Sequence, residues 1–542
     1  MPVVRLYYED MERLIGASRE TIMSRLAMMG ADIGKRAEED HVDVEFFPDR
    51  PDLYSAEGVA RAMQGFLGIK TGLVEYAVEK GPVVLQVEES VKSVRPLIGC
   101  AIVRDLEFTS EAIESLMGLQ EDLHWGLGRN RRKVAIGVHD ISRVTPPFRY
   151  FGEDPSRKFV PLDFTEEMTM QEMLHKHPKG KDYGHILEGC ERYPLIVDSL
   201  NQVLSFPPII NGELTSVTEE TRDLFIDVTG TDPMVYKALN IVVTSLAERG
   251  GRVESVRVLG SEGDFLSPNL EPDLWKVRAE EANKLIGFEL TGEELAECLE
   301  KMRFGAKAEG ELVLVQAPAY RADIMHSWDI FEDAAKAFGF DNLKAELPRT
   351  VTVGRAHPAE VRKAEIREVM AGLGYLETMP FTLTNEKVHF EWMRRSEAVA
   401  GATHVLHPIS ELHTILRTSL LSSLLEIFAN NQHHPLPQRI FAAGDVVVDR
   451  KTRMHLAAAS IHSGASFSEI RSVIDAVLRE LNILAEIEII PSQDGALVPG
   501  RGADLMQEGQ RIGCFGELHP LVLRAFGLEQ PAVALELKWG EL

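Results

Sequence analysis

The sequence predicts an α+β protein of several domains, and three observations support this fold class. The chain has 542 residues, and at about 150 residues per domain this gives room for roughly three to five domains. Hydrophobic residues make up 44% of the chain, as in globular proteins with packed cores. Strand-like alternation and helical spacing follow one another along it, separated by glycine, proline and acidic clusters.

Charge and cysteine usage restrict the class further. The 58 basic and 84 acidic residues give a net charge of −26, which excludes a protein that coats nucleic acid or anionic membranes nonspecifically but not a local basic surface that docks a structured RNA. The four cysteines are far apart and match no zinc spacing. The N-terminus does not resemble a signal peptide, and no apolar run approaches the ~20 residues of a membrane span. We therefore expect a cytoplasmic protein with no membrane partner.

The first 90 residues are predicted to form an N-terminal α/β domain. Residues 3–8 and 42–47 are strand-like, and residues 10–29 carry apolar side chains at helical spacing. Ser55 is a typical N-cap for the helix that follows.

Residues 91–265 are predicted to form a larger α+β domain. Strand candidates lie at 134–138 and 224–228, and the polar stretch 175–181 is expected to be a surface loop. Asp227 and Thr229 are two residues apart, so on a strand they point to the same face. Such a pair could orient a water or read a polar substrate group. A turn closed by the two side chains is the simpler interpretation of these residues alone.

Residues 266–347 are predicted to form a small winged-helix-like domain, in which Thr291 and Glu294 form a capping box. Four carboxylates lie within eleven residues at its last helix: Asp323 just upstream of the helix, and Asp329, Glu332 and Asp333 on it. The last three share one helix face, and oxygen ligands crowded in this way suit Mg²⁺. Acidic residues also favour a helix N-terminus without any metal.

Residues 348–542 are predicted to form a final α/β domain. Strand candidates include 439–442, 456–461 and 534–537, and Ser466 with Glu469 is read as a second capping box. The chain has neither a P-loop nor a dinucleotide-binding glycine pattern.

Several segments, in order along the chain, resemble the archaeal form of the phenylalanyl-tRNA synthetase beta-subunit family. They are residues 45–54, 207–213, 320–333, 417–421, 444–446 and 516–520. The resemblance implies that the N-terminal α/β domain, 1–90, is followed by a tRNA-editing domain, 91–265, and a winged-helix-like domain with an acidic metal cluster, 266–347. The final domain, 348–542, is expected to have a class II synthetase-like antiparallel sheet without catalytic motifs. Neither an Arg-x-Glu pair placed as in the ATP-binding motif nor Gly-x-Gly-x-x-Arg is found there.

The resemblance also implies a function. In this family an α₂β₂ heterotetramer joins phenylalanine to tRNA-Phe, and the alpha subunit uses ATP to activate phenylalanine. We therefore expect the beta subunit of phenylalanine–tRNA ligase, with the alpha subunit and tRNA-Phe as partners. The beta subunit is expected to hydrolyse tyrosine wrongly attached to tRNA-Phe. A pocket that hydrogen-bonds the tyrosine hydroxyl rejects phenylalanine, because its polar groups would then be unpaired.

Site residues carried over from the resemblance fall into two groups. The editing pocket is expected to comprise Leu204, Ser205, Glu213, Asp227 and Thr229. Mg²⁺ is expected at Asp323, Asp329, Glu332 and Asp333, near the alpha subunit, where it would help to hold the assembly. The resemblance leaves open whether a side chain or a tRNA hydroxyl activates the hydrolytic water.

Basic residues in the editing domain are candidate tRNA contacts, although solvated loops explain them nearly as well. They are Arg129, Arg131, Arg132, Lys133, Lys176 and Lys179. Two competing functions are an independent Mg²⁺-dependent hydrolase and a stand-alone trans-editing or RNA-docking factor.

Overall fold

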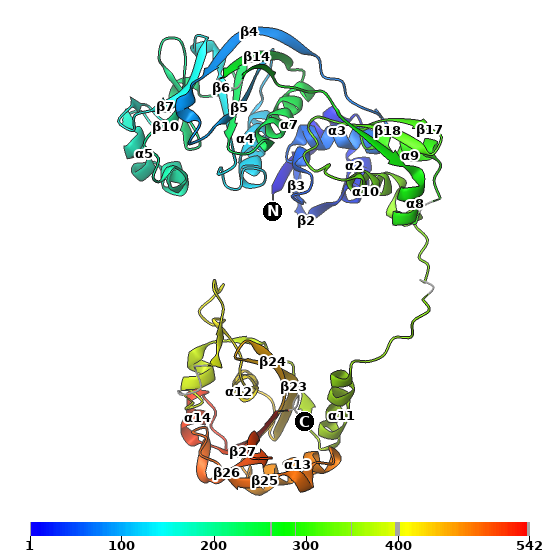
Figure 1. Cartoon of the computed structure of the whole chain (residues 1–542), viewed down its shortest axis with the longest axis vertical. Helices are drawn as coiled ribbons and strands as arrows, with labels where there is room; N and C mark the ends of the chain where they lie inside the picture. Colours follow the sequence, from blue (N-terminus) through cyan, green and yellow to red (C-terminus); the bar gives the residue numbers. More distant parts are fainter. Residues whose placement is uncertain (1, 261–262, 288, 348–349, 396–400, 539–542) are drawn as a thin grey trace. The chain divides into compact units, whose positions relative to one another are not determined.

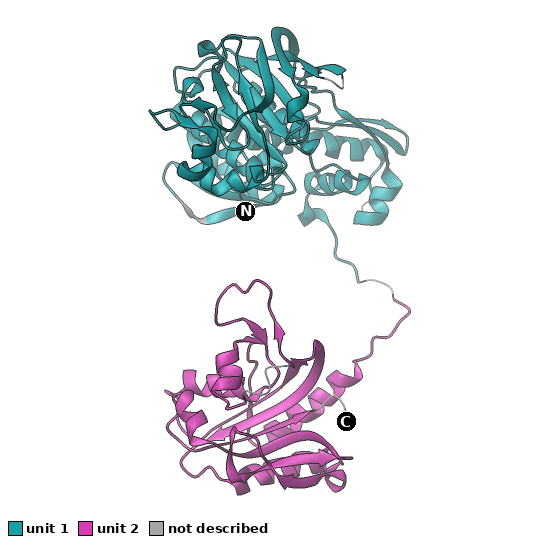
Figure 2. Ribbon diagram, turned by 60° about the vertical axis from the view of Figure 1, so that its left-hand side comes forward, with its two compact units in different colours: residues 1–347 teal, residues 348–542 magenta. Residues whose placement is uncertain are grey.

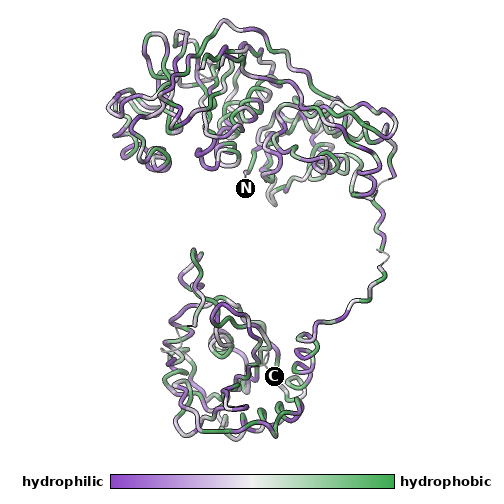
Figure 3. Tube along the Cα trace, in the orientation of Figure 1, coloured by the Kyte–Doolittle hydropathy of each residue, from purple (hydrophilic) through white to green (hydrophobic). Residues whose placement is uncertain are grey.

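Contacts within the chain divide it into two units, residues 1–347 and 348–542 (Figure 2). The computed structural model describes residues 2–260, 263–287, 289–347, 350–395 and 401–538. Hydrophobic and hydrophilic residues alternate along the trace of both units (Figure 3), and the hydrophobic ones collect into several buried clusters. The finer division into four domains stays a prediction.

A three-stranded antiparallel sheet of order β1-β3-β2 and three helices form the start of the first unit. Their bounds are β1 Val3–Tyr7, α1 Tyr8–Ile15, α2 Arg19–Leu26, β2 Ala31–Ala37, β3 His41–Phe46 and α3 Ala56–Phe66. The helical spacing over 10–29 belongs to two α-helices, because Gly16 has a φ of 80° and separates α1 from α2. Glycine adopts this left-handed conformation without a Cβ clash. Ser55 caps α3 as predicted, its hydroxyl accepting from the Gly58 N–H at 3.1 Å.

A ten-stranded sheet dominates the rest of the first unit (Figure 1). Its order is β12-β11-β10-β7-β4-β14-β5-β13-β6, with β15 paired to β14. The bounds are β4 Val78–Val87, β5 Leu97–Arg104, β6 Val134–Asp140, β7 Phe148–Glu153, β10 Tyr193–Val197, β11 Val203–Phe206, β12 Ile210–Asn211, β13 Leu224–Gly230, β14 Arg252–Gly260 and β15 Gly263–Ser267. Both expected strands, at 134–138 and 224–228, are confirmed as β6 and β13.

Helices α4, Ser110–Trp125, and α7, Met234–Glu248, pack on one face of this sheet. Leu224, Ile226 and Val228 of β13 belong to the core that these helices cover. Because side chains alternate along a strand, the odd-numbered residues of β13 lie on the opposite face. This alternation places Asp227 and Thr229 together, away from the helix-covered core.

A short excursion between β7 and β10 contains β8 Lys158–Phe159, β9 Met168–Thr169, α5 Met170–Lys176 and α6 Pro178–Tyr183. The prediction of a loop over 175–181 is therefore wrong. Pro178 occupies the first turn of α6, where its missing N–H costs nothing. The His177 ring accepts from the Lys179 N–H at 3.1 Å and caps the same helix.

The end of the first unit is a three-stranded antiparallel sheet of order β16-β18-β17 packed against three helices. Their bounds are β16 Asp273–Arg278, α8 Ala279–Ile286, α9 Gly292–Lys301, β17 Gly305–Glu309, β18 Leu312–Ala317 and α10 Ser327–Phe338. The capping box at the start of α9 is confirmed. The Thr291 N–H donates to Glu294 at 2.8 Å, and the Glu294 N–H donates to the Thr291 hydroxyl at 3.2 Å.

The second unit is built on a seven-stranded sheet of order β19-β23-β24-β28-β27-β26-β25, antiparallel except for the β19–β23 pair. The strands are β19 Leu376–Glu377, β23 Gln438–Val448, β24 Lys451–Ile461, β25 Glu488–Pro491, β26 Leu497–Gln507, β27 Gln510–Leu518 and β28 Ala532–Lys538. The helices are α11 Pro358–Gly372, α12 Leu421–Asn430, α13 Phe467–Glu480 and α14 Pro520–Ala525. A small sheet contains β20 Leu383–Thr384, β21 Thr403–His404 and β22 Ile415–Leu416.

The large sheet of the second unit separates two hydrophobic cores. Ala457 and Ala459 of β24 pack in the core that contains α12, whereas Leu456 and Ala458 pack in the core that contains α11 and α13. A strand buried on both faces is apolar at nearly every position, which explains the run at 456–461, where Ser460 is the one polar residue.

The second predicted capping box is wrong. Ser466 precedes α13 but its side chain makes no capping bond. Glu469 instead accepts from the Ser460 hydroxyl at 3.0 Å and contacts the His462 ring at 2.8 Å. In the part of the chain that the structure describes, no helix is both long enough and apolar enough to cross a membrane.

Candidate functional site

A cavity of about 330 Å³ lies where β6 and β13 meet α4 and the β11–β12 hairpin. The hairpin turns through a cis peptide bond between Pro207 and Pro208. Polar groups from sequence-distant elements line the cavity, among them Gln120, Glu121, Arg131, Ser205, Asn211, Thr215 and Asp227. A small concave space with a few placed polar groups is the usual form of a site that binds one small chemical group.

Asp227 lies in β13 and is hydrogen-bonded in register between β5 and β6. The side chain is 1% exposed, and its Oδ2 lies 2.8 Å from His139 Nε2. The other ring nitrogen, Nδ1, lies 2.8 Å from the hydroxyl of Thr215. Both ring nitrogens are therefore engaged, which fixes the plane of the imidazole and the direction of the carboxylate. The second carboxylate oxygen, Oδ1, has no hydrogen-bond partner among the described residues and is left to the cavity that Asp227 lines.

Gly137 leaves the space that this pair needs. It lies directly opposite Asp227 in the β6–β13 register. A Cβ at this position would lie 2.1 Å from Asp227 Oδ2 and 2.8 Å from His139 Nε2. Any other residue would therefore displace the carboxylate or the ring.

The hairpin supplies a second polar wall. The Ser205 hydroxyl donates to Asn211 Oδ1 at 3.1 Å, and Asn211 Nδ2 donates to the carbonyl of Val138 at 3.3 Å. These bonds tie the hairpin to β6 and hold Ser205 at the cavity.

Arg131 closes the cavity from the loop between α4 and β6. Its guanidinium donates to the carbonyls of Pro208 at 3.3 Å and Ile209 at 2.9 Å, and to Glu121 at 2.7 Å. Three consecutive residues, 129 to 131, have φ values of 49°, 53° and 63°. Left-handed conformations in residues with side chains are costly and persist only where surrounding contacts impose them. The contacts of Arg131 are such a restraint.

The structure brings together only part of the predicted editing set. Ser205 and Asp227 line the cavity, whereas Leu204, Glu213 and Thr229 are not among its lining residues. Leu204 neighbours Ser205 on the strand and so points the opposite way, into a hydrophobic core. The exposed Glu213 accepts from the Asp163 N–H at 3.0 Å.

Thr229 shares the face of Asp227 but lies against a different residue. Its hydroxyl accepts from Arg95 Nε at 2.9 Å, and its carbonyl accepts from Arg95 Nη2 at 2.8 Å. Burial lowers the pKa of Arg95 to about 10, against the opposing effects of Tyr150 and Asp227. This arginine remains charged at neutral pH and covers Thr229.

The sequence analysis missed His139 and Gly137. Continuing the alternation of β6 past residue 138 places His139 on the same face as Gly137. That signal was present, but the sequence does not reveal that β6 pairs with β13.

The side chains of the four acidic residues around α10 contact different partners and do not converge on one point. Asp329 caps the helix, its Oδ2 accepting from the N–H groups of Met325 and His326 at 2.7 Å each. Asp323 accepts from two nitrogens of Arg321 at 2.8 and 2.5 Å. The side chain of Glu332 is 59% exposed and lies 2.9 Å from Lys336 Nζ.

Asp333 belongs to a buried charge network. It is 1% exposed, with Oδ2 2.6 Å from Arg321 Nη2 and Oδ1 3.7 Å from Arg50 Nη1. Arg50 in turn donates to both oxygens of Asp52, at 2.8 and 2.9 Å. Burial alone would raise the pKa of Asp52, but the charge and hydrogen bonds of Arg50 outweigh it and hold the pKa at about 2.

The contacts of the four carboxylates decide whether the cluster can bind a metal ion. Among the described residues, no group of three or more His, Cys, Asp or Glu side chains is arranged to hold an ion. Arg321 and Lys336 already neutralise Asp323, Asp333 and Glu332. As arranged, the four carboxylates therefore do not fit a complete Mg²⁺ site, and the predicted Mg²⁺ stays untested.

The cluster nevertheless borders a large cleft of about 1270 Å³ within the first unit. Asp323, Asp329, Glu332 and Asp333 line one part of it, and Arg129, Arg132 and Lys133 line another. The cleft thus joins the acidic helix to the outer side of the loop whose Arg131 closes the smaller cavity.

Two segments match described families. Residues 275–340 match the tRNA synthetase B5 domain, and residues 343–539 match the phenylalanyl tRNA synthetase beta chain CLM domain. An N-terminal fragment of the phenylalanyl-tRNA synthetase beta subunit from Pyrococcus horikoshii is similar in structure, with a TM-score of 0.60 and 40% identity. It covers 62% of this chain and 99% of the fragment. These similarities define the chain as a subunit of an aminoacyl-tRNA ligase.

Full-length relatives specify which ligase. A phenylalanine–tRNA ligase beta subunit from Methanothrix thermoacetophila is 67% identical over 99% of both chains. Those from Methanococcoides burtonii and Archaeoglobus fulgidus are each 54% identical over at least 98% of both chains. The chain belongs to the phenylalanine–tRNA ligase beta-subunit family in its archaeal form, which confirms the resemblance seen in the sequence.

We expect Gly137→Ala to disrupt the Asp227–His139 pair, because the added methyl overlaps the carboxylate. Overpacking of this kind costs about 1–3 kcal/mol. The midpoint of chemical denaturation of the first unit should fall accordingly, followed by tryptophan fluorescence and circular dichroism. Gly118→Ala is the matched control, since a Cβ there meets no atom within 4 Å. An equal response of the two variants would contradict the role given to Gly137.

We expect Asp333 and Glu332, neighbours on one helix, to differ sharply in their effect on stability. Asp333→Asn leaves Arg321 with one buried carboxylate fewer, and breaking a buried pair costs about 3–5 kcal/mol. Glu332→Gln removes an exposed pair and should change the free energy of unfolding by less than about 1 kcal/mol. Urea denaturation of the two variants measures the difference, and equal losses would show that the network does not depend on Asp333.

Proposed function

We propose that this chain is the editing subunit of a phenylalanine–tRNA ligase and that its 330 Å³ cavity receives the side chain of tyrosine wrongly attached to tRNA-Phe. The observation that carries the proposal is the orientation of Asp227. One oxygen is held by His139, and the other has no partner among the described residues and is left to the cavity.

A buried carboxylate in this position can distinguish tyrosine from phenylalanine, because phenylalanine lacks the hydroxyl group. A tyrosine hydroxyl can donate to Asp227, whereas a phenylalanine ring would leave the buried carboxylate without water and without a donor. Leaving a buried polar group unsatisfied costs about 1–3 kcal/mol, and more when the group is charged. A pocket that hydrogen-bonds a hydroxyl therefore discriminates strongly against a ligand that lacks the hydroxyl. An apolar pocket discriminates much more weakly against a ligand that carries an extra hydroxyl.

Hydrolysis itself needs a water directed at the ester. The His139 ring is held on both nitrogens, so it serves to orient Asp227 in this arrangement. A tRNA hydroxyl near the water remains an equally suitable activator, as in the sequence-based expectation. The chain residues are assigned to recognition and positioning.

The cleft beside the cavity suits the tRNA end that must present the ester. Of the six basic residues predicted to contact tRNA, Arg131 and Lys179 bind Glu121, Lys133 binds Asp232, and Lys176 binds Glu172. Arg129 and Arg132 are exposed on the cleft, and their side chains have no bonding partner among the described residues. We assign the phosphate contacts to these two.

Aminoacylation chemistry is proposed to reside in the alpha subunit, which binds ATP and phenylalanine. The missing ATP-binding motifs support this division, and so does the use of Arg417. Its guanidinium donates to the carbonyls of Asp445 at 2.8 Å, Pro380 at 2.9 Å and Phe381 at 3.2 Å. These bonds occupy the Arg417 guanidinium, which therefore holds loops of the unit together. We retain the α₂β₂ assembly and the cytoplasmic location as predictions.

Mg²⁺ is proposed to bind only in that assembly. Glu332 and the free oxygen of Asp329 face the cleft, while Asp323 and Asp333 are held by Arg321. Mg²⁺ prefers about six oxygen ligands and keeps several waters. The partner subunit or water must supply the rest.

We expect Asp227→Ala to slow deacylation of Tyr-tRNA-Phe by about tenfold or more, because the tyrosine hydroxyl loses its buried acceptor. Synthesis of Phe-tRNA-Phe by the α–β complex should stay near the wild-type rate, which also reports that the variant folds and assembles. Asp223→Ala, at a position just before the same strand, is the control and should deacylate normally. Unchanged deacylation by Asp227→Ala would remove Asp227 from the site.

We expect Glu332→Gln to raise the Mg²⁺ concentration needed for half-maximal assembly with the alpha subunit, because one accessible ligand loses its charge. Analytical ultracentrifugation across a Mg²⁺ titration measures the shift. Glu297→Gln, an exposed change on α9, removes the same charge away from the cleft. Identical titrations for both variants and wild type would show that Glu332 does not bind Mg²⁺ and that the acidic cluster is purely structural.

A further inference from the structure

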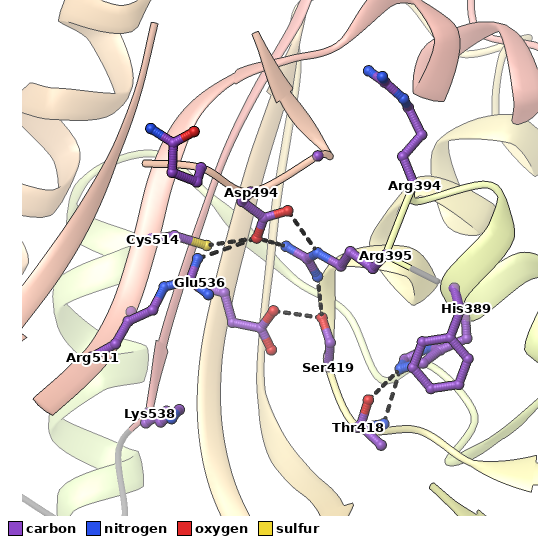
Figure 4. A pocket seen from close by; sticks show the side chains of 14 residues that line it. His389, Arg394, Arg395, Thr418, Ser419, Asp494, Arg511, Cys514, Glu536 and Lys538 are labelled. Carbon is purple, nitrogen blue, oxygen red and sulfur yellow. Dashed lines mark hydrogen bonds and ion pairs between the residues drawn. The ribbon is translucent and has the colours of Figure 1, made fainter. Parts of the chain in front are cut away.

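The second unit contains a cavity of about 550 Å³ that the proposed editing function does not use. It lies against strands β27 and β28 and is closed by the segment before α12 and by the loop at 493–495 (Figure 4). Its volume falls within the range of small-molecule sites, about 300–1,000 Å³. The lining side chains that matter here are Arg394, Arg395, Asp494, Arg511, Glu536 and Lys538.

A network of ion pairs and hydrogen bonds forms the wall of this cavity. Arg395 donates to both oxygens of Asp494 at 2.9 and 2.7 Å, and Arg511 contacts the same carboxylate at 3.2 Å. Glu536 accepts from the Ser419 hydroxyl at 2.5 Å and from the Leu420 N–H at 2.8 Å. The side chains of Arg395 and Asp494 are 16% and 5% exposed. A largely buried ion pair is seldom the most stable way to fill a core, so its place beside a cavity points to a bound ligand.

The charges on this wall do not cancel. Four cationic side chains and two carboxylates line the cavity, and Arg511 also pairs with Asp504 at 2.8 Å, in a chain whose overall charge is −26. Arg395 and Arg511 share Asp494, while the side chains of Arg394 and Lys538 have no hydrogen bond or ion pair with any other described residue. In Figure 4 these two side chains lie on opposite sides of the pocket.

The state of Lys538 agrees with this excess of positive charge. Its pKa is lowered, first by partial burial and then by the neighbouring charges of Arg511 and Arg453. A bound anion between Arg394 and Lys538 would offset that repulsion. An anionic ligand would offset the positive charge that remains on the lining.

We propose that this cavity binds a small phosphate-bearing anion, with Arg394 and Lys538 as its direct contacts and the Arg395–Asp494–Arg511 network as their support. A phosphate-bearing anion suits a site with two separated cations, because its phosphate oxygens can accept from one of them while the rest of the molecule extends towards the other. The phosphate could belong to a free oligophosphate or to a nucleotide. The site is independent of the editing cavity, which lies in the other unit.

Isothermal titration of the full-length chain at low ionic strength tests the proposal, with inorganic pyrophosphate in one arm and AMP in the other. Wild type should bind at least one of them saturably. The double variant Arg394→Ala/Lys538→Ala should weaken binding by about tenfold or more, since both direct charges are lost. Binding in only one arm identifies the source of the phosphate.

A charge-matched control separates a built site from general attraction. Lys387→Ala/Lys451→Ala removes two exposed positive charges of the same unit outside the cavity and should bind as wild type does. Equal weakening in both double variants, or no saturable binding by wild type in either arm, would overturn the proposal. Protection of Lys538 from amine acylation by the bound ligand, read by peptide mass spectrometry, gives a second measurement that does not rely on a substituted chain.

Discussion

Pairing of buried charge around Arg321 is the constraint on which the arrangement of the first unit depends. Arg321 and Asp333 are almost fully buried and meet Arg50 and Asp52, which come from the opposite end of that unit. Removing such groups from water is expensive unless every charge finds a partner, so these segments can be buried only together. The stacking of Arg61 on Tyr320, 3.5 Å from its ring centroid, belongs to the same contact. It follows that the main role of the acidic cluster of α10 is structural. A metal ion could bind only to the carboxylate oxygens that Arg321 does not occupy.

The candidate editing site obeys the same rule on a smaller scale. Asp227 is buried on β13, next to the edge strand β6, and His139 satisfies only one of its oxygens among the described residues. Because β5, β13 and β6 are hydrogen-bonded along their length, the carboxylate is held on a rigid surface, and Gly137 leaves the space for it. A single buried acceptor held rigidly in place can select for a hydroxyl group. When a ligand lacks the hydroxyl, neither water nor side-chain movement can satisfy the acceptor instead.

The second unit shows how a sheet with apolar cores on both faces accommodates charge. Several of its ionisable groups line one cavity, where Arg395 pairs with Asp494 and Glu536 accepts from Ser419. Arg417, near the same sheet, is committed to backbone carbonyls. The unit therefore combines a scaffold stabilised by packing with one cationic pocket whose charges are not fully balanced.

The sequence by itself determined the family, through motifs in fixed order. It also determined β6, β13 and the α9 capping box, and the common face of Asp227 and Thr229, because these depend on residues close together in the chain. Tertiary structure alone decided that His139 and Gly137 join Asp227, that Leu204 faces a core, and that Arg95 covers Thr229. It also turned Asp333 inward to Arg321 and left Glu332 exposed. Local spacing defines which face of an element a side chain occupies. The partner that it meets there depends on strand register and on contacts between distant segments, which residue spacing does not specify.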